Sequence, residues 1–568
     1  MSKKYIIVGG VTGGASTATR IRRLDEKAEI TIYEKNGYVS FSNCCLPYYL
    51  GGLIGNKPED LILLTPDNFK HQYNINVQVN SLVTEIDPKE KIITVKNVQT
   101  GEIKKDSYDD LILSPGADPV RPKSIEGIDA SNVFTVRNVD DVRAIHDYLE
   151  KQDINDVAVI GGGFIGLEVT ENLVQTGKHV SLIEAADHVL ATVDDEFAQI
   201  VQKELYDHGV NVILRDGLAE IKKDKIILGS GREIKAKAVI VAIGVKPDTA
   251  LARKAGCKLG VTGSIQVNQG FETSVPHIYA VGDAIELTNA ITRKITRLAL
   301  AFPAQMEARK VADHLYKRQI TRPGVIGSQA IHIFDINVSS TGLTEAACRK
   351  EGIDCRVATV IPKDKVGLMP GAKPLYLKLV FDYPSGEILG AQALGYHDVD
   401  KQIDIIATAI QFHAHVQDLE DLQLAYSPWF STAKNAVNMV GLVATNILNN
   451  EYKQVEISKV RELVEKGATI IDARERNEFE EGHIKGAINI PLSEFREKLD
   501  QIPKDKPVYV HCLSGQRSYN MVRALGNLGF TNIYNISGSY LELCEYEYFR
   551  DQTTDRKPIV TKYRFDLL

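Results

Sequence analysis

Seven cysteines, at positions 44, 45, 257, 348, 355, 512 and 544, are the residues of this 568-residue chain with the most versatile chemistry. Their number is odd, and none shows the paired Cys-x-x-Cys spacing of a structural zinc site, so we expect no metal. In a reducing compartment an individual cysteine is either a small buried filler or a working thiol. The residues around each cysteine must decide between these roles.

Two segments of the chain repeat the order strand, glycine-rich turn, helix, strand. In the first, residues 3–8 form an apolar strand, Gly9 to Gly14 form the turn, and residues 30–34 form the next strand, which ends at Glu34. This order predicts a βαβ unit. Glu34 lies 20 residues after Gly14, which is the spacing typical of dinucleotide-binding units. Val11 occupies the middle glycine position and departs from the pattern.

The second segment begins about 150 residues later, with a strand over residues 157–160. Gly161, Gly163 and Gly166 form its turn, and Glu184 ends the following strand. Glycines allow the backbone to approach a pyrophosphate at a helix N-terminus, and the acidic residue binds the adenosine ribose. Two such units in one chain make purely structural turns an improbable explanation. They predict two nucleotide sites.

Glu184 also bears on the choice of nicotinamide cofactor. Its carboxylate would repel the 2′-phosphate of NADPH, and residues 185–188 contain no arginine that could bind this phosphate. We therefore expect NADH in the second site.

Two later segments carry a resemblance to known proteins. Residues 111–117 and residues 273–283 resemble the segments by which flavoprotein oxidoreductases return to their FAD domain. The resemblance covers residues 1–447 and implies FAD in the first unit, held at Gly9, Gly14 and Glu34, and a nicotinamide nucleotide in the second. It also implies that Asp283 hydrogen-bonds the ribityl chain of the flavin.

The segment around Cys44 indicates the reaction. Disulfide reductases with an internal disulfide carry two cysteines spaced CxxxxC, but the residue five positions after Cys44 is Tyr49. Residues 40–49, Ser-Phe-Ser-Asn-Cys-Cys-Leu-Pro-Tyr-Tyr, resemble the signature of coenzyme A-disulfide reductases and their persulfide-reducing relatives. By this resemblance Cys44 is the redox nucleophile, and its second sulfur comes from a substrate such as CoA disulfide, a persulfide or a polysulfide.

The same resemblance implies a site for CoA. Arg20 and Arg23 would hold its phosphates, and Ser40 and Asn43 would bind it near the cysteine. The alternative is that the arginines, together with Arg22, form a solvated basic helix face. Cys45 departs from the family, and is either a small filler or a resolving thiol.

A further segment, Leu424 to Pro428, resembles a family segment whose tyrosine reaches the active site of the partner subunit. Tyr426 inherits the role of proton donor or oxyanion stabiliser, against the alternative of a core tyrosine. A second family tyrosine precedes a Pro-Gly pair, but here Met369 precedes Pro370. Its loss leaves the proton to Tyr426 or water.

Residues 470–491 and 508–518 resemble the rhodanese fold. Cys512 follows an apolar strand and enters a loop whose backbone amides converge on the sulfur, with Arg517 adding positive charge. Four residues separate Cys512 from Arg517. This length suits the outer sulfur of a persulfide, whereas related phosphatases have five. The alternative is a degenerate module used only for binding. The remaining cysteines, at 257, 348, 355 and 544, are predicted to be structural.

These features predict an α/β protein with two Rossmann-like domains, an α+β dimerisation domain and a C-terminal α/β rhodanese domain. The expected boundaries are listed in chain order: FAD domain 1–150, NADH domain 151–245, second part of the FAD domain 246–324, dimerisation domain 325–447, linker 446–451 and rhodanese domain 452–552. The resemblance of residues 325–447 implies a homodimer with a shared active site.

Charge and hydropathy exclude several classes of partner. The net charge is −7 and no long basic run is present, so we expect no nucleic-acid partner. No stretch approaches the roughly 20 consecutive apolar residues of a membrane span, and no signal-peptide pattern follows Lys3 and Lys4. We therefore expect a cytoplasmic protein that acts on small molecules.

The leading hypothesis is an FAD-dependent reductase that uses NADH and Cys44 to reduce a disulfide, persulfide or polysulfide, coupled to sulfur carried on Cys512. One rival is an NADH oxidase in which Cys44 cycles through a sulfenic acid. The other is a sulfur relay in which the flavoprotein part only senses redox state.

Overall fold

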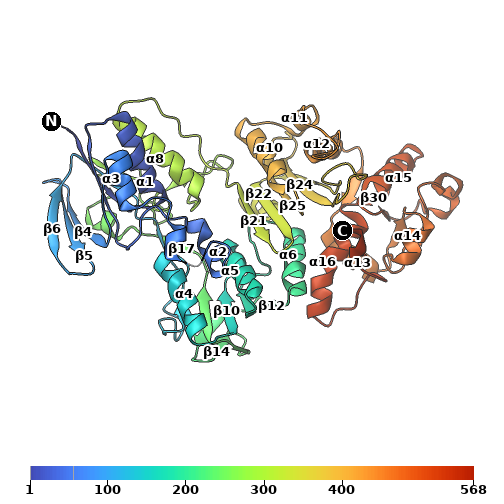
Figure 1. The fold of residues 1–568 in the computed structure, drawn as a ribbon. Helices are drawn as coiled ribbons and strands as arrows, with labels where there is room; N and C mark the ends of the chain where they lie inside the picture. Colours follow the sequence, from blue (N-terminus) through green and yellow to red (C-terminus); the bar gives the residue numbers. More distant parts are fainter. Residues whose placement is uncertain (1, 56) are drawn as a thin grey trace. The chain divides into compact units, whose positions relative to one another are not determined.

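The computed structural model describes residues 2–55 and 57–568. The chain divides into two compact units, residues 1–183 with 216–325, and residues 184–215 with 326–568. Each unit is described separately (Figure 1). Within the described residues, no helix combines the length and apolar character needed to cross a bilayer.

The first unit contains a parallel sheet in the order β18-β7-β1-β2-β3. Its central strand β1 is buried on both faces, as the apolar residues Tyr5, Ile6 and Ile7 require. Helices α1 and α8 pack against each other beside this sheet (Figure 1). The elements are β1 (Lys4–Val8), α1 (Thr12–Leu24), β2 (Glu29–Tyr33), β3 (Asn76–Gln78), β7 (Asp110–Leu113), β18 (Ile278–Ala280) and α8 (Ala301–Leu315).

A second parallel sheet in this unit repeats the arrangement. Strand β10 pairs with β11 on one side and β16 on the other, and β9 pairs with the far edge of β16. The elements are β9 (Val133–Phe134), α4 (Val139–Lys151), β10 (Asp156–Ile160), α5 (Phe164–Gln175), β11 (His179–Glu184) and β16 (Ala238–Val241). Strand β9 therefore joins this sheet from before residue 151, where the sequence places the start of the domain. The predicted domain boundaries stay a prediction.

Smaller elements complete the first unit. An antiparallel sheet contains β4 (Ser81–Asp87), β5 (Ile92–Asn97) and β6 (Ile103–Ser107), and another contains β13 (Leu218–Ile221), β14 (Lys225–Leu228) and β15 (Glu233–Lys235). Two strand pairs are β8 (Ala117–Pro119) with β17 (Val245–Pro247) and β19 (Leu287–Thr288) with β20 (Ile295–Thr296). The helices are η1 (Asn43–Cys45), α2 (Leu46–Leu50), η2 (Pro58–Leu61), α3 (Pro66–Tyr73) and α7 (Ala250–Lys254).

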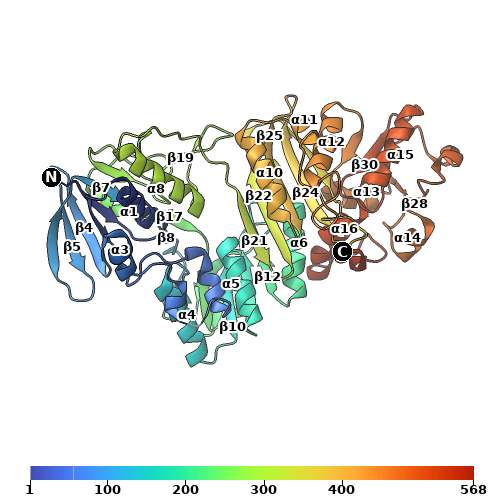
Figure 2. The ribbon, with the colours of Figure 1, turned by 45° about the horizontal axis from the view of Figure 1, so that its top comes forward.

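The second unit begins with α6 (Asp195–Asp207) and β12 (Asn211–Leu214) and then forms an antiparallel sheet in the order β21-β22-β25-β24-β23. Helix α10 packs on β22 and β25, and α12 packs on β23 and β24 (Figure 2). The elements are β21 (Gln329–Ile333), β22 (Ile336–Gly342), α9 (Glu345–Glu351), β23 (Cys355–Val360), β24 (Leu375–Asp382), β25 (Ile388–Gly395), α10 (Val399–Gln411), α11 (Val416–Glu420) and α12 (Ala436–Leu448).

Helix α12 runs into the segment that the sequence predicts as a linker. The prediction of a linker from residue 446 is wrong at its start, because Ile447 packs in the core and the helix ends only at Leu448. Asn449 then caps the helix, since its N–H bonds the carbonyl of Thr445.

A parallel sheet in the order β26-β30-β29-β27-β28 forms the C-terminal domain. Its elements are β26 (Lys453–Val455), η3 (Ile457–Lys459), α13 (Val460–Glu465), β27 (Thr469–Asp472), α14 (Arg476–Glu481), β28 (Ile488–Asn489), η4 (Phe495–Glu497), η5 (Leu499–Gln501), β29 (Val508–His511), α15 (Gln516–Asn527), β30 (Ile533–Ile536), α16 (Ser539–Thr553) and η6 (Phe565–Leu567). The chain beyond residue 552 packs back on this domain, where Val560 bridges Ile484.

A buried ion cluster joins α6 to the antiparallel sheet of the second unit. The side chain of Lys378 on β24 is 2% exposed and its ammonium lies 2.9 Å from carboxylate oxygens of both Asp194 and Glu345. It also pairs with Glu196. Burial opposes ionisation of Asp194, but the charge of Lys378 and the hydrogen bonds from Lys378, Gln392 and the N–H of Ala346 together outweigh burial and lower the pKa of Asp194. Lys378 thus pairs with three carboxylates, one of which, Glu345, also pairs with Arg349.

We predict that Lys378→Met lowers the free energy of unfolding by about 3–5 kcal/mol, because the buried Asp194 and its neighbour Glu196 would lose their paired cation, and Glu345 would keep only Arg349. Urea unfolding measures the change. Lys225→Met, which removes an exposed ion pair with Glu233, is the matched control and should leave the midpoint unchanged. Equal midpoints for the two variants would contradict a stabilising role of the cluster.

Candidate active sites

The first glycine turn brings α1 very close to the end of β1. A Cβ atom added to Gly14 would lie 1.8 Å from the carbonyl oxygen of Gly9, so no other residue fits there. Val11 is accommodated at the N-cap of α1, which no side chain caps. Glu34 follows β2, and its carboxylate accepts hydrogen bonds from the N–H of Gly10 at 2.8 Å and of Asn36 at 2.9 Å. The residues predicted for FAD thus share one edge of the sheet.

In the second glycine turn, α5 lies equally close to the end of β10, and the position beside Gly163 is open. A Cβ atom on Gly166 would lie 1.9 Å from the carbonyl oxygen of Gly161, whereas one on Gly163 would meet nothing within 4 Å. No side chain caps the N-terminus of α5. Uncapped N–H groups at the start of a helix favour binding of a phosphate. Glu184 ends β11, and its carboxylate accepts the N–H of Ala186 at 2.8 Å.

Cys44 lies in the short helix η1, which leads into α2, and is exposed. Ser40, four residues earlier, has a φ of 49°, an uncommon conformation for a residue with a side chain. Its N–H bonds the carbonyl of Gly10, which ties this loop to the first glycine turn. The Oδ1 atom of Asn43 is buried and has no hydrogen-bond partner among the described residues. An orphaned acceptor beside a thiol fits a ligand that donates a hydrogen bond.

The electrostatic surroundings of Cys44 disfavour its thiolate. Partial desolvation of the thiol, followed by the charges of Glu168, Cys45 and Asp283, raises the pKa of Cys44. Burial also raises the pKa of Glu168, to about 7, and the hydroxyl of Tyr48 lies 3.4 Å from its carboxylate. A carboxyl group that titrates near neutral pH therefore acts on this thiol.

Sequence analysis missed Glu168. It lies on α5, more than 120 residues after Cys44, and no local pattern distinguishes it from an ordinary polar helix residue. Only the fold shows its effect on the thiol.

Asp283 follows β18 in the same unit. Burial raises its pKa, and the charge of Arg137 partly offsets this. The preceding N–H, that of Gly282, is held by the carboxylate of Glu307 on α8 at 2.6 Å. Asp283 also contributes to the raised pKa of Cys44, which places the two predicted residues in one electrostatic environment.

The three arginines of α1 have different surroundings. Arg22 is buried and donates to five backbone carbonyls, so the interpretation as a solvated face is wrong for this residue. Arg20 forms an ion pair with Asp313 on α8, and only 13% of its side chain is exposed. Arg23 is exposed. Arg20 could bind a phosphate only by sharing or leaving Asp313.

Tyr426 lies in the second unit, between α11 and α12, and 51% of it is exposed. The alternative of a core tyrosine is therefore wrong. Trp429 and Phe430 in the same loop are exposed by 60% and 65%. Three large aromatic side chains so close in sequence on the surface are typical of a protein interface.

Cys512 follows β29 and lies under a loop of hydrogen-bond donors. Its Sγ accepts the N–H of Gly515 at 3.2 Å, and the hydroxyl of Ser518 lies at 3.6 Å. The hydroxyl of Ser539 lies at 4.0 Å, and Cys512 itself is 2% exposed. The loop leads into the N-terminus of α15, whose dipole favours a negative charge on sulfur.

The charge of Arg517 acts on Cys512, and Arg517 also makes a contact that the sequence does not predict. Its guanidinium donates to both carboxylate oxygens of Glu478 on α14, at 2.6 and 2.8 Å. Glu478 is thus a residue that sequence analysis missed. The ion pair closes one side of the loop, and it positions the positive charge that the sequence assigned to Cys512.

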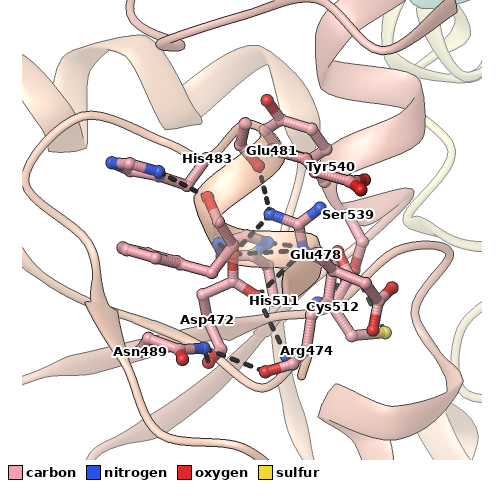
Figure 3. Close-up of polar contacts among 12 residues, drawn as sticks. Asp472, Arg474, Glu478, Glu481, His483, Asn489, His511, Cys512, Ser539 and Tyr540 are labelled. Carbon is pink, nitrogen blue, oxygen red and sulfur yellow. Dashed lines mark hydrogen bonds and ion pairs between the residues drawn. The ribbon is translucent and has the colours of Figure 1, made fainter. Parts of the chain in front are cut away.

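A buried cluster that contains Asp472, Arg474 and Tyr540 lies near Cys512 (Figure 3). Arg474 is 1% exposed and donates to Asp472 and to the carbonyl of Gly482. Its guanidinium also lies 4.2 Å from the ring centroid of Tyr540. The cluster joins β27, α14 and α16 around Cys512. Sequence analysis did not assign these roles.

Three family matches cover most of the chain. Residues 3–308 match pyridine nucleotide-disulphide oxidoreductases, residues 328–437 match the dimerisation domain of this family, and residues 456–545 match the rhodanese-like domain. The predicted dependence on FAD and a nicotinamide nucleotide agrees with this family, and the predicted fold class is confirmed.

Among curated relatives, coenzyme A disulfide reductase of Staphylococcus haemolyticus is 33% identical over 446 residues, which cover 78% of this chain and 100% of the relative. Two solved structures match nearly the whole chain. Reduced Bacillus anthracis CoADR-RHD is 42% identical with a TM-score of 0.92, and covers 96% of this chain and 98% of its own. An NAD-dependent persulfide reductase from A. fulgidus is 32% identical with a TM-score of 0.90, and covers 96% and 100%.

A water-forming NADH oxidase from Lactobacillus brevis is 28% identical with a TM-score of 0.75, and covers 79% of this chain and 99% of its own.

The glycine turns, the cysteine beside the first of them and the family matches all indicate the same family. The chain belongs to the pyridine nucleotide-disulphide oxidoreductase family and carries a rhodanese-like domain after its dimerisation domain.

Proposed function

We propose that this protein uses NADH to reduce sulfur–sulfur bonds at Cys44, and that Cys512 carries the sulfane sulfur. The observation that carries the proposal is the combination of a single-cysteine redox segment with a persulfide-type loop in one chain. Cys44 has no CxxxxC partner, so the second sulfur comes from a substrate. The loop at Cys512 supplies hydrogen-bond donors that would stabilise one extra sulfur atom.

The step at Cys44 is a thiol–disulfide exchange. The Cys44 thiolate attacks one sulfur of R–S–S–R′, the new bond joins Cys44 to that sulfur, and R′S⁻ leaves. With a persulfide, R–S–SH, the leaving group is either a thiol or hydrosulfide, depending on which sulfur is attacked. Bound FAD would supply the two electrons of NADH, which with two protons cleave the new bond at Cys44, restore its thiol and release the bound group as RSH, or as hydrogen sulfide where Cys44 took the outer sulfur of a persulfide. Gly9, Gly14, Glu34 and Asp283 would hold FAD, and Gly161, Gly163, Gly166 and Glu184 would hold NADH.

The proposed substrates are CoA disulfide, CoA persulfide or polysulfide. The names of the Staphylococcus and A. fulgidus relatives support this class. Within this chain, the orphaned Oδ1 of Asn43 and the strained Ser40 would contact the ligand beside Cys44. Arg23, which is exposed, and Arg20, if it shares Asp313, would bind phosphates.

We also propose a homodimer, supported by the matching dimerisation domain. The exposed aromatic loop of Tyr426, Trp429 and Phe430 would be covered in it. Tyr426 would then donate a proton in the partner's site, since this chain has Met369 where a second family tyrosine would stand.

Cys44→Ser should reduce anaerobic NADH consumption with CoA persulfide or polysulfide by more than about 1,000-fold, because a hydroxyl cannot replace the nucleophilic thiolate. Cys512→Ser should keep turnover with CoA disulfide but lose sulfur transfer from thiosulfate or another sulfane donor. The absorbance of NADH at a fixed substrate concentration measures NADH consumption. The release of thiocyanate from cyanide measures sulfur transfer. Cys257→Ser, at a buried cysteine of the first unit, is the control.

An aerobic assay without sulfur substrate distinguishes the reductase from the rival function, an NADH oxidase. The similarity to the L. brevis oxidase is the reason to test for oxidase activity. NADH consumption that requires oxygen and not sulfur would establish an oxidase and overturn the reductase. Sulfur transfer without any NADH turnover would establish a relay.

Glu168→Gln should lower the pKa of Cys44, because ionised Glu168 is the largest charge that raises it. In the wild type, Glu168 is ionised above a pH of about 7 and opposes formation of the thiolate there. The variant should therefore react several-fold faster with iodoacetamide at neutral pH, and its alkylation profile should shift to lower pH. Peptide mapping of Cys44 at a series of pH values measures the rate. Glu150→Gln, at an exposed carboxylate, is the control, and an unchanged profile in Glu168→Gln would contradict the assignment.

A further inference from the structure

Ser539, the first residue of α16, has an unusual backbone conformation. Its φ is 56°, in the left-handed region that favours glycine, and it follows Gly538, whose φ is 71°. Its side chain is fully buried. A residue with a side chain persists in this conformation only where the surrounding structure requires it. Ser539 lies 27 positions after Cys512 and outside the motifs that the sequence shows around that cysteine.

Three hydrogen bonds join the start of α16 to the loop of Cys512. The hydroxyl of Ser539 accepts the N–H of Cys512 at 3.2 Å. The N–H of Tyr540 donates to the carbonyl of Cys512 at 3.2 Å, and the N–H of Leu541 donates to the carbonyl of Leu513 at 3.0 Å. The first N–H groups of a helix have no partner within the helix, so these two carbonyls satisfy two of them. Helix α16 therefore starts directly against Cys512.

The hydroxyl of Ser539 has one proton and two acceptors for it. The carbonyl oxygen of Ile536 lies 3.2 Å from the hydroxyl, and Sγ of Cys512 lies 4.0 Å from it. Ser518 on α15 has the same choice, between the carbonyl of Gly515 at 3.0 Å and Sγ at 3.6 Å. A thiol is a weak acceptor, whereas an anion accepts strong hydrogen bonds. Both hydroxyls can therefore turn from a carbonyl to the sulfur when Cys512 becomes an anion.

We propose that Ser539 stabilises the sulfur anion of Cys512, as a hydrogen-bond donor to the sulfur and as the residue that fixes the N–H of Cys512. The anion is the persulfide that Cys512 would carry or the thiolate that remains after transfer, so the role rests on the function proposed for Cys512. Gly515 and Ser518 belong to the loop and to the helix that follows it, whereas Ser539 comes from a different helix. The site is therefore complete only where α16 packs on the loop.

The elements next to Cys512 carry several ionisable side chains. In chain order these are Asp472 on β27, Arg474, Glu478 on α14, His511 on β29, Arg517 on α15 and Glu542 on α16. Replacing Ser539 by alanine or glycine changes none of these charges. A shift in the titration of Cys512 therefore reports either the hydroxyl or the backbone, and two variants separate these causes.

Alkylation of Cys512 at a series of pH values tests the proposal in the reduced, full-length holoprotein. Iodoacetamide reacts with the thiolate, and the tryptic peptide 505–517 contains Cys512 as its single cysteine. Ser539→Ala should shift the profile to higher pH by about one unit, which is about a tenfold lower rate at pH values below both midpoints.

Ser539→Gly should give the same shift, because it also lacks the hydroxyl. Glycine relieves the strain of the positive φ, so its thermal midpoint should exceed that of Ser539→Ala. Ser537→Ala, at a buried serine whose N–H pairs with Val455 of β26, is the control and should keep the wild-type profile. An unchanged profile in both Ser539 variants would overturn the proposal. A shift in the alanine variant alone would assign the effect to the backbone and overturn the role of the hydroxyl.

Sulfur transfer from thiosulfate to cyanide, which yields sulfite and thiocyanate, distinguishes this role from the function on which it rests. If the wild type transfers no sulfur through Cys512, the sulfur-carrying function is refuted, and with it the role of Ser539 towards a persulfide. If it does, Ser539→Ala should be about tenfold slower at low pH and equal to the wild type above the midpoint of its own alkylation profile. Equal rates at low pH would overturn the role of Ser539 while leaving the sulfur-carrying function intact.

Discussion

The close approach of a helix to the strand that precedes it is the constraint on which both predicted nucleotide sites depend. Gly14 and Gly166 allow it, since a Cβ atom at either would overlap a carbonyl oxygen of the same turn. The N-termini of α1 and α5 then meet the carboxyl edges of their sheets. Cys44 depends on this arrangement too, because its loop is tied through Ser40 to the first turn.

The thiols of Cys44 and Cys512 lie in different electrostatic surroundings. Cys44 is exposed, but partial desolvation of its thiol and the nearby carboxyl groups of Glu168 and Asp283 raise its pKa and disfavour the thiolate. Cys512 is buried, and three donors surround its sulfur. Hydrogen-bond donors of this kind would stabilise the outer sulfur of a bound persulfide. This difference suits a centre that exchanges electrons and a centre that stores sulfur.

Local patterns were sufficient for the elements that carry the glycine turns and Cys512. Strands β1, β10 and β29 lie within a residue of their predicted positions, because each is a short apolar run before a turn. The end of α12 was not predictable in this way. The Asn-rich sequence at the last turn of α12 predicts a linker, but the packing of Ile447 in the core keeps this turn helical. Tertiary contacts here outweigh propensity.

The sequence by itself determined the family and the two nucleotide units, and it predicted Cys44 and Cys512 as the working thiols, because these inferences depend on residues close together in the chain. Tertiary structure decided which charges act on those thiols. Glu168 lies more than 120 residues from Cys44, and Arg517 pairs with Glu478 rather than standing free. Electrostatic and hydrogen-bond energies depend on distance and burial in space, and neither is encoded in local spacing.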